Sequence, residues 1–201
     1  MDRVGCRVYK DAQRWYPKVR IRSPLAEEEL VVRAFSHQLE YEGMVNYFHG
    51  ADDAFLHGMG VEREKLPQRE EWLSQLLLDH QVDESARDRV YLAWIYGGEQ
   101  VGHSSLARLK IGEEAYIHLH LWRSDLRRAG LGAEFFKRSV NFAFEKFRLQ
   151  RLWCEPCAAN PAPNRVLTKL GFRLVGHYRG VPGPINFEQD VNRYELGGPI
   201  P

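Results

Sequence analysis

The sequence is poor in cysteine, and it has neither a long apolar run nor an excess of charge of one sign. The three cysteines, Cys6, Cys154 and Cys157, are too few and odd in number for the disulfide framework of a small secreted protein, so we expect free thiols. The 28 Lys and Arg nearly balance the 27 Asp and Glu, which argues against a protein dedicated to binding nucleic acid. Residues 1–20 lack the apolar segment of a signal peptide, and no apolar run approaches the length of a membrane span. We therefore expect a cytoplasmic protein that contacts neither nucleic acid nor a membrane.

What is present is an ordinary globular composition. Hydrophobic residues make up 44% and charged residues 27% of the 201-residue chain, and these proportions are typical of soluble folded proteins. A chain of this length can bury one continuous core without metals or disulfides. We expect residues 1–201 to form a single domain, and nothing in the sequence indicates its oligomeric state.

The first part of the chain has mixed patterns. Residues 18–22 alternate and favour a strand, and Ser23 is placed to cap a helix with an acidic first turn. We expect this helix to extend over residues 24–48, with or without an interruption. Residues 50–60 are rich in glycine and aspartate and favour a loop, and a second helix is predicted over residues 67–80.

The remaining pattern predicts an α/β (α+β) fold. Three alternating segments joined by glycine turns predict an antiparallel meander over residues 90–96, 100–109 and 115–122. Aromatic side chains recur at helical spacing over residues 135–147, so we interpret them as the core-facing side of a helix rather than a surface for a partner. The other predicted elements are a helix start at 134, a strand over 151–155, a helix over 163–170 and strands over 172–178 and 191–196.

A strand, a glycine-bearing loop and a long helix follow one another from residue 121 to residue 133. Gly130 and Gly132 allow a ligand to approach the backbone closely, and the free N–H groups of a helix's first turn attract an anion such as a pyrophosphate. Arg127 and Arg128 add positive charge. A Gly-x-Gly in this position is also common in plain tight turns, so both interpretations stay open on these residues alone. The segment lacks the third glycine of a dinucleotide-binding motif and the Gly-Lys-Ser/Thr of a Walker motif.

Two signatures taken together resemble the GCN5-related N-acetyltransferase (GNAT) superfamily. Residues 127–132 match in full its pattern of Arg or Gln, two residues, Gly, one residue, and Gly or Ala. The second signature of the superfamily follows at residues 160–172. The resemblance extends from residue 88 to residue 180, and residues 152–172 are most similar to the branch of ribosomal-protein and small-molecule acetyltransferases (RimJ/RimL-like).

This resemblance implies one domain with a mixed, mainly antiparallel and splayed sheet flanked by helices, in which coenzyme A lies between two central strands. It implies transfer of an acetyl group to a primary amine, with acetyl-CoA as co-substrate and without a metal. The backbone of Leu121 and Trp122 would hold the pantetheine and polarise the thioester carbonyl. The residues that the resemblance assigns to coenzyme A binding are Leu121, Trp122, Arg127, Arg128, Ala129, Gly130, Leu131, Gly132, Ala133, Asn160 and Asn164.

His118 and His120 lie two residues apart on the strand before the glycine loop, so their side chains share one face. An amine must lose a proton when it attacks a thioester, and an imidazole with an ordinary pKa of about 6.5 suits that task. Arylalkylamine acetyltransferases, which are similar in this region, also carry histidines on the corresponding strand. We assign the catalytic base to His118, with His120 second, and the sequence leaves open a pair of hydrogen-bonded structural histidines as the alternative.

A zinc site is a second interpretation of the same histidines. Cys154 and Cys157 lie in and after a predicted strand, and with His118 and His120 they could supply four ligands. The GNAT superfamily needs no metal, so we expect none and interpret the thiols as small apolar groups.

One position departs from the pattern of many GNAT enzymes. Those enzymes carry a tyrosine, four residues before the glycine of the second signature, that protonates the leaving coenzyme A thiolate; the residue here is Leu167. Tyr178 or Tyr194 could replace it from a neighbouring strand. The thiolate could also leave as an anion or take a proton from water.

The acceptor amine has no signature in the sequence. A protein N-terminus, a polyamine, an aminoglycoside and a siderophore precursor all stay open as acceptors, and the candidates for the acceptor side are Trp15, Tyr16, His57, Met59 and residues 180–190. Two alternatives to an N-acetyltransferase for an unidentified amine remain. One is a siderophore-precursor acyltransferase of the same fold, and the other is a catalytically degenerate coenzyme A-binding module with a regulatory role.

Overall fold

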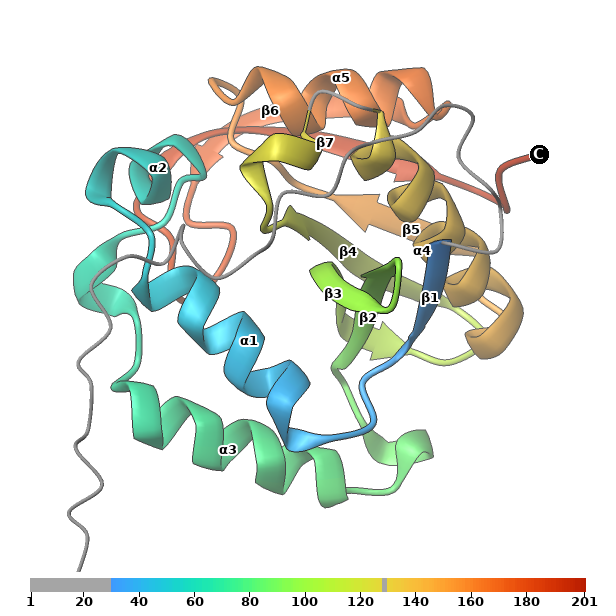
Figure 1. Cartoon of the computed structure of the whole chain (residues 1–201). Helices are drawn as coiled ribbons and strands as arrows, with labels where there is room; N and C mark the ends of the chain where they lie inside the picture. Colours follow the sequence, from blue (N-terminus) through green and yellow to red (C-terminus); the bar gives the residue numbers. More distant parts are fainter. Residues whose placement is uncertain (1–29, 128–129) are drawn as a thin grey trace, which may run out of the picture.

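The computed structural model describes residues 30–127 and 130–201, which form a seven-stranded sheet with helices on both faces (Figure 1). The strands are β1 (Leu30–Ala34), β2 (Val90–Tyr96), β3 (Glu99–Lys110), β4 (Glu114–Leu121), β5 (Arg151–Cys154), β6 (Arg173–Gly180) and β7 (Gln189–Leu196). The helices are α1 (Gln38–His49), α2 (Asp53–Gly58), α3 (Arg69–Gln81), α4 (Leu131–Phe147) and α5 (Pro161–Lys169), with single 3-10 turns at Arg63–Lys65, Glu84–Ala86 and Ser124–Leu126. The features predicted from the sequence that lie outside the described residues are the strand over 18–22, the helix start at Ser23, and Cys6, Trp15, Tyr16, Arg128 and Ala129.

The sheet is antiparallel except between β4 and β5. The strand order is β1-β2-β3-β4-β5-β7-β6, and β4 runs parallel to β5. On β4, β5 pairs only with Glu114, Ala115 and Tyr116. The rest of β4, as far as Leu121, has no strand partner on that side among the described residues. The prediction of a mixed, mainly antiparallel and splayed sheet is confirmed.

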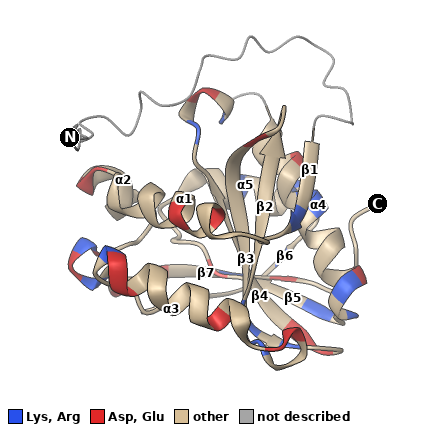
Figure 2. Ribbon diagram, turned by 60° about the horizontal axis from the view of Figure 1, so that its bottom comes forward, with Lys and Arg blue, Asp and Glu red and all other residues tan. Residues whose placement is uncertain are grey.

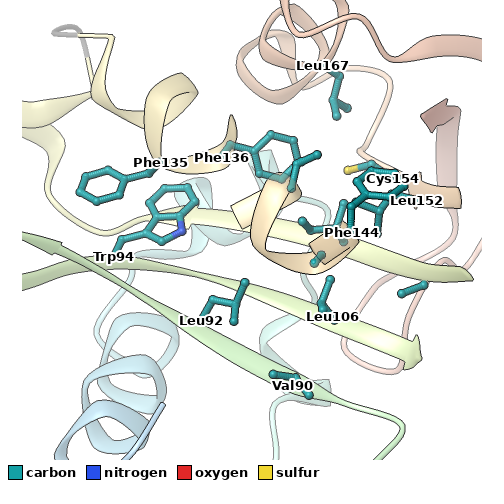
Figure 3. Close-up of a cluster of buried hydrophobic side chains, with 14 of the residues drawn as sticks. Val90, Leu92, Trp94, Leu106, Phe135, Phe136, Phe144, Leu152, Cys154 and Leu167 are labelled. Carbon is teal, nitrogen blue, oxygen red and sulfur yellow. The ribbon is translucent and has the colours of Figure 1, made fainter. Parts of the chain in front are cut away.

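One face of the sheet packs against α4 and α5. Phe135 and Phe136 of α4 are fully buried here. Phe135 stacks on Trp94 of β2 at 5.3 Å between ring centroids (Figure 3), and Phe136 lies against Phe172. The indole Nε1 of Trp94 donates to the hydroxyl of Ser139 at 2.9 Å, so the one polar group of this ring is satisfied inside the core. The interpretation of the aromatic helix as core is confirmed.

The opposite face of the sheet packs against α1, α2 and α3, and Figure 1 shows α1 and α3 side by side along it. Its core contains Tyr41, Val45 and Phe48 of α1, Leu76 of α3 and Ala93 of β2. The two cores fix the sheet between two helical layers. The end of β4 that has no β5 partner is therefore held in place by its pairing with β3 and by helices on both sides.

Two predictions for the first part of the chain are wrong. Residues 30–34 form strand β1 rather than part of a helix, and they pair with β2 along the edge of the sheet. The acidic residues before them indicate a helix start, but Val31 and Val32 are β-branched and have an unpaired strand edge to join. The predicted loop over residues 50–60 contains the helix α2, which Asp52 caps by accepting a hydrogen bond from the N–H of Phe55 at 2.7 Å. From α3 onward the predicted and observed elements agree in type and order.

Acidic and basic residues are interspersed over the outer helices and strand ends, and neither sign dominates a whole side of the ribbon (Figure 2). Within the described ranges, no helix has the length and apolar character needed to cross a membrane.

Candidate active site

The gap between β4 and β5 exposes backbone groups of β4. The N–H of Trp122 donates to the carbonyl of Val101 on β3 at 2.9 Å. Because backbone groups of a strand point alternately to its two neighbours, the N–H and C=O groups of Leu119 and Leu121 face the gap instead. The carbonyl of Leu121 accepts from the guanidinium of Arg127 at 3.3 Å. The backbone of Leu121 therefore faces the gap, whereas the N–H of Trp122 is already engaged on β3. Leu119 also faces the gap, although the sequence did not single it out, and the binding of coenzyme A by any of these residues stays a prediction.

The glycine loop ends at the start of α4, beside this gap. Gly130 is the N-cap residue of α4 and has a left-handed backbone with φ of 77°, which favours glycine. The N–H of Ala133 donates to the carbonyl of Gly130 at 3.1 Å. Among the described residues, the N–H groups of Leu131 and Gly132 are therefore the first-turn donors without a backbone acceptor. The side chain of Leu131 is fully buried and anchors the helix in the core. Gly132 lies against Leu121, so the first turn of α4 and the open edge of β4 form one continuous surface.

Asn160 and Asn164 belong to α5, at the far side of the gap. Asn160 caps α5 by accepting from the N–H of Ala162 at 3.3 Å, and it lines the adjoining cavity. The amide of Asn164 donates to the carbonyls of Cys157 and Asn160 and accepts from two side chains of β7. Asn164 therefore braces the start of α5 against β7. Any contribution of either asparagine to coenzyme A binding stays a prediction.

A cavity of about 600 Å³ begins at the gap and extends over the face of the sheet that α1, α2 and α3 cover. Its walls come from those helices, from β3 and β4, from the segment between β5 and α5, and from the loop after β6. Of the residues put forward for the acceptor side, Met59 and residues 182–186 line this cavity. His57 does not line it and instead stacks on Phe187 with 4.7 Å between ring centroids.

His118 and His120 both line this cavity, and a third histidine joins them. His103 of β3 pairs with His120 in the sheet register, and their rings stack with centroids 4.7 Å apart. The indole Nε1 of Trp122 donates to Nδ1 of His103 at 2.8 Å. The sequence analysis did not single out His103. Its signal is that two consecutive alternating strands pair in an antiparallel hairpin, which places a residue of the first strand beside His120 of the second.

Burial keeps all three imidazoles neutral at pH 7. It lowers the pKa of His118 to about 4, with the nearby cations Arg89 and Arg108 adding to the effect. It lowers the pKa of His120 to about 3, helped by His118, and that of His103 well below its usual value. No hydrogen bond to a ring nitrogen of His118 is found among residues 30–127 and 130–201, so its lone pair is available to a ligand in the cavity.

His120 is the more enclosed of the two predicted bases. The rings of Phe48 and Tyr47 lie 5.2 and 5.7 Å from it, and Tyr47 in turn stacks on Trp122. The hydroxyl of Tyr47 donates to the sulfur of Met59 at 3.2 Å, and burial raises the pKa of this phenol. The aromatic enclosure fixes His120, whereas His118 has no such ring contacts in the described part of the chain.

The sequence matches the family described as an acetyltransferase (GNAT) domain over residues 29–173, which is more than half of the chain. The chain belongs to the GNAT acetyltransferase family. The predicted superfamily and the predicted enzyme class, an N-acetyltransferase, are thereby confirmed.

Solved structures of other GNAT proteins share this fold. RimL, a ribosomal L7/L12 alpha-N-protein acetyltransferase in complex with coenzyme A, is 16% identical with a TM-score of 0.70, over 87% of this chain and 97% of that chain. The ribosomal-protein-S5-alanine acetyltransferase from Vibrio fischeri is also 16% identical with a TM-score of 0.70, over 87% and 96%. Spermidine N-acetyltransferase from Vibrio cholerae, in complex with CoA and spermine, is 17% identical with a TM-score of 0.68, over 85% and 96%. At these identities the likeness concerns the fold. No curated protein matches the sequence at a significant level.

The position at which many GNAT enzymes carry a tyrosine acid is closed in this chain. Leu167 is fully buried in the core beside α4, so it does not reach the cavity. Neither Tyr178 nor Tyr194 lines the cavity. The hydroxyl of Tyr194 donates to Asn164 at 3.1 Å, and Tyr178 lies beside Arg193, whose guanidinium is 5.2 Å from its ring centre.

The four residues considered as zinc ligands all line the cavity, but they are not placed to share a metal ion. Among the residues that the structure describes, no group of three or more His, Cys, Asp or Glu is placed to hold a metal ion. Cys154 is buried in the core, where burial raises the pKa of its thiol to about 12, and Cys157 is partly exposed.

Proposed function

We propose that this GNAT enzyme transfers an acetyl group from acetyl-CoA directly to a primary amine, with both substrates bound at once. The observation that carries the proposal is one continuous site. The glycine-capped start of α4, the unpaired edge of β4 and a cavity containing three neutral histidines follow one another without interruption. The anion-binding, backbone-pairing and base functions of acyl transfer each have a place in it.

Coenzyme A would bind along the first two parts of this site. The N–H groups of Leu131 and Gly132, with the guanidinium of Arg127, would hold the pyrophosphate. The pantetheine would complete the open edge of β4 as an added strand does, through the backbone of Leu119 and Leu121. An N–H on this edge would polarise the thioester carbonyl as negative charge develops on its oxygen. The contributions of Trp122, Arg128, Ala129, Ala133, Asn160 and Asn164 remain part of the proposal.

His118 would move the proton. The amine nitrogen attacks the thioester carbonyl carbon, the C–S bond breaks, and the nitrogen gives a proton to His118 as its positive charge builds up. An imidazolium with a pKa of about 4 does not hold that proton at neutral pH. A thiol has an ordinary pKa of about 8.5, so His118 would pass the proton on to the leaving thiolate. Such a relay accounts for an enzyme with leucine at position 167 instead of a tyrosine acid.

His118 is preferred over His120 because of what surrounds each ring. His120 is held between Phe48, Tyr47 and His103, so an acceptor nitrogen has less access to it. Ser105, the residue opposite His118 in the register, is small and also lines the cavity. His118 is therefore the base that the cavity leaves open to an acceptor.

Thiol release from acetyl-CoA across a panel of amines tests the proposal. We expect release with at least one class of amine and none with buffer alone. Binding of coenzyme A without turnover for any amine, siderophore precursors included, would instead favour a regulatory coenzyme A-binding module. Calorimetric titration with coenzyme A separates that outcome from a chain that binds no coenzyme A.

A further inference from the structure

The charged side chains that line the cavity are almost all basic. They are Lys65, Arg89, Arg108, Arg127 and one carboxylate, Glu155. Glu155 is 7% exposed and is already paired with Arg193 at 2.5 Å, so the described lining has no free carboxylate to hold a cationic acceptor. Lys65 is also satisfied, by Glu62 and by the carbonyl of Asn186.

Arg108 is turned toward the cavity by an irregularity in β3. In a regular strand it would point with Leu106 to the opposite face, which packs against α4. The register with β4 shifts between Ala107 and Lys110, and Arg108 has a positive φ of 51°, which is uncommon for a residue with a side chain. Its guanidinium consequently lies 4.8 Å from the ring centre of Tyr116, on the cavity face. Backbone strain of this kind concentrates at functional sites, because a side chain is held where regular structure would not place it.

Arg89 is the second cation at this end of the cavity. It precedes β2, is exposed and lines the cavity, and it shares a side-chain hydrogen bond with Tyr91. Within the described ranges, neither Arg89 nor Arg108 has a carboxylate within ion-pair distance, and Asp79 and Asp88 act on Arg89 only through space. Their positive charges add to the effect of burial in lowering the pKa of His118. Two guanidinium groups without a carboxylate partner in the described ranges thus line the same cavity as the proposed base.

Coenzyme A does not account for this pair. Arg108 lies beside Tyr116, and Tyr116 is five positions along β4 from Leu121 at the pyrophosphate end. At 3.3 Å per residue this distance is roughly 17 Å. The anion recognised by Arg89 and Arg108 therefore belongs to another molecule or to another part of the acceptor.

We propose that the acceptor is a small amine that also carries an acidic group, and that Arg89 and Arg108 bind this group while the amine faces His118. The proposal rests on the acyl transfer described above and specifies its substrate class as an amino acid or a related amino carboxylate. His118 and Arg108 are close along paired strands, because Ser105 opposes His118 and the bulge begins two residues later at Ala107. The short separation between His118 and Arg108 suits the two ends of a small molecule rather than a long polyamine.

Matched substrates test the assignment. β-Alanine and phenylalanine are compared with their carboxamides, and spermidine serves as the polycation, in thiol release from acetyl-CoA and in calorimetric binding to the protein loaded with coenzyme A. We expect the acids to exceed the amides by about tenfold or more in kcat/KM and in affinity, the scale of a lost charged hydrogen bond. Equal values for acid and amide, or a preference for spermidine, would overturn the substrate class even if transfer itself is observed.

Arg108→Gly is the sharpest variant, because glycine suits the positive φ at this position and should leave the fold at least as stable. It and Arg89→Ala should each remove most of the preference for the acid while leaving affinity for coenzyme A unchanged. Arg173→Ala, at an exposed site paired with Glu195, is the matched control and should retain the preference. Persistence of the preference in both cavity variants would overturn the assignment. Binding selectivity without turnover would uphold it and contradict the proposed function instead.

Discussion

The imidazole rings of His103 and His120 stack across β3 and β4 with their centroids 4.7 Å apart. Protonation of both rings would place two positive charges in contact at a buried position that already disfavours each charge. The indole of Trp122 donates to Nδ1 of His103, a bond that requires an unprotonated nitrogen there. The arrangement therefore requires neutral histidines, and it makes the stability of the fold depend on pH.

We expect the folded state to lose stability as the pH falls from about 6.5 to about 4. Unfolded histidines titrate near 6.5, whereas the pKa of folded His118 is about 4, so between these values the unfolded chain binds more protons. The free energy of unfolding then decreases with decreasing pH, by about 1.4 kcal/mol for each unit of pKa difference at each site. Urea unfolding at half-unit pH steps measures this slope.

His118→Gln should flatten the same pH dependence, since it removes one titrating group without removing polarity from the cavity. His177→Gln, at an exposed site on β6, is the control and should leave the slope unchanged. An unaltered slope in His118→Gln would show that other groups cause the loss of stability.

Gly132→Glu should reduce the affinity for coenzyme A by about a hundredfold or more while the chain stays folded. A carboxylate there would repel the pyrophosphate and occupy its place, whereas an acid near a helix start is otherwise favourable. A Cβ at this position meets only Leu121, at an ordinary 3.6 Å, so the substitution fits the folded chain. Calorimetric titration with coenzyme A measures the effect.

Gly130→Glu should have the same effect on binding but also cost stability, because φ is 77° at this position. Gly112→Glu, in the turn between β3 and β4, is the matched control, because Gly112 has a similar φ of 80° and open space around a new side chain. We expect the control to lose stability and keep its coenzyme A affinity. Normal affinity in both glycine-loop variants would remove the start of α4 from the binding site.

His118→Ala should lower kcat by roughly a hundredfold or more, the usual effect of losing a general base, with little change in coenzyme A affinity. Because burial lowers the pKa of His118 to about 4, the acid limb of the wild-type kcat profile should lie near pH 4 rather than near 6.5. That limb should be absent in the variant. Near-normal turnover in His118→Asn, or an acid limb that survives the substitution, would favour proton transfer to water and a structural role for the histidines.

The sequence predicted the central strands of the sheet and the start of α4 after the glycine loop well, because both depend on local patterns. Alternation and glycine turns determine β2, β3 and β4, and the spacing from Arg127 to Gly132 determines the loop. β1 was predicted as helix because its acidic flank is a local helix signal, and only pairing with β2 decides in favour of a strand.

The residues that the sequence did not reveal are those placed by contacts between strands. His103 joins the other histidines through the register of β3 with β4, which no single segment encodes. Arg108 reaches the cavity only because a bulge interrupts the two-residue period on which a face prediction depends. The bulge explains both facts about Arg108. It makes the two-residue period assign the side chain to the wrong face, and it turns the side chain into the cavity, where we propose that it binds substrate.

Leu167→Tyr, which restores the residue of many GNAT enzymes, should destabilise the protein and should not raise kcat. Leu167 is fully buried beside α4 and does not line the cavity, so a larger ring would overpack the core, at a cost of about 1–3 kcal/mol, and its hydroxyl would lack a partner there. If His118 relays the proton from nitrogen to sulfur, an added acid has no missing step to supply. Urea unfolding and the kcat for the best amine test the two parts, with Leu167→Met as the volume-matched control that should be close to wild type in both. A stable Leu167→Tyr variant with faster turnover would show that thiolate protonation limits the rate and that His118 does not perform it.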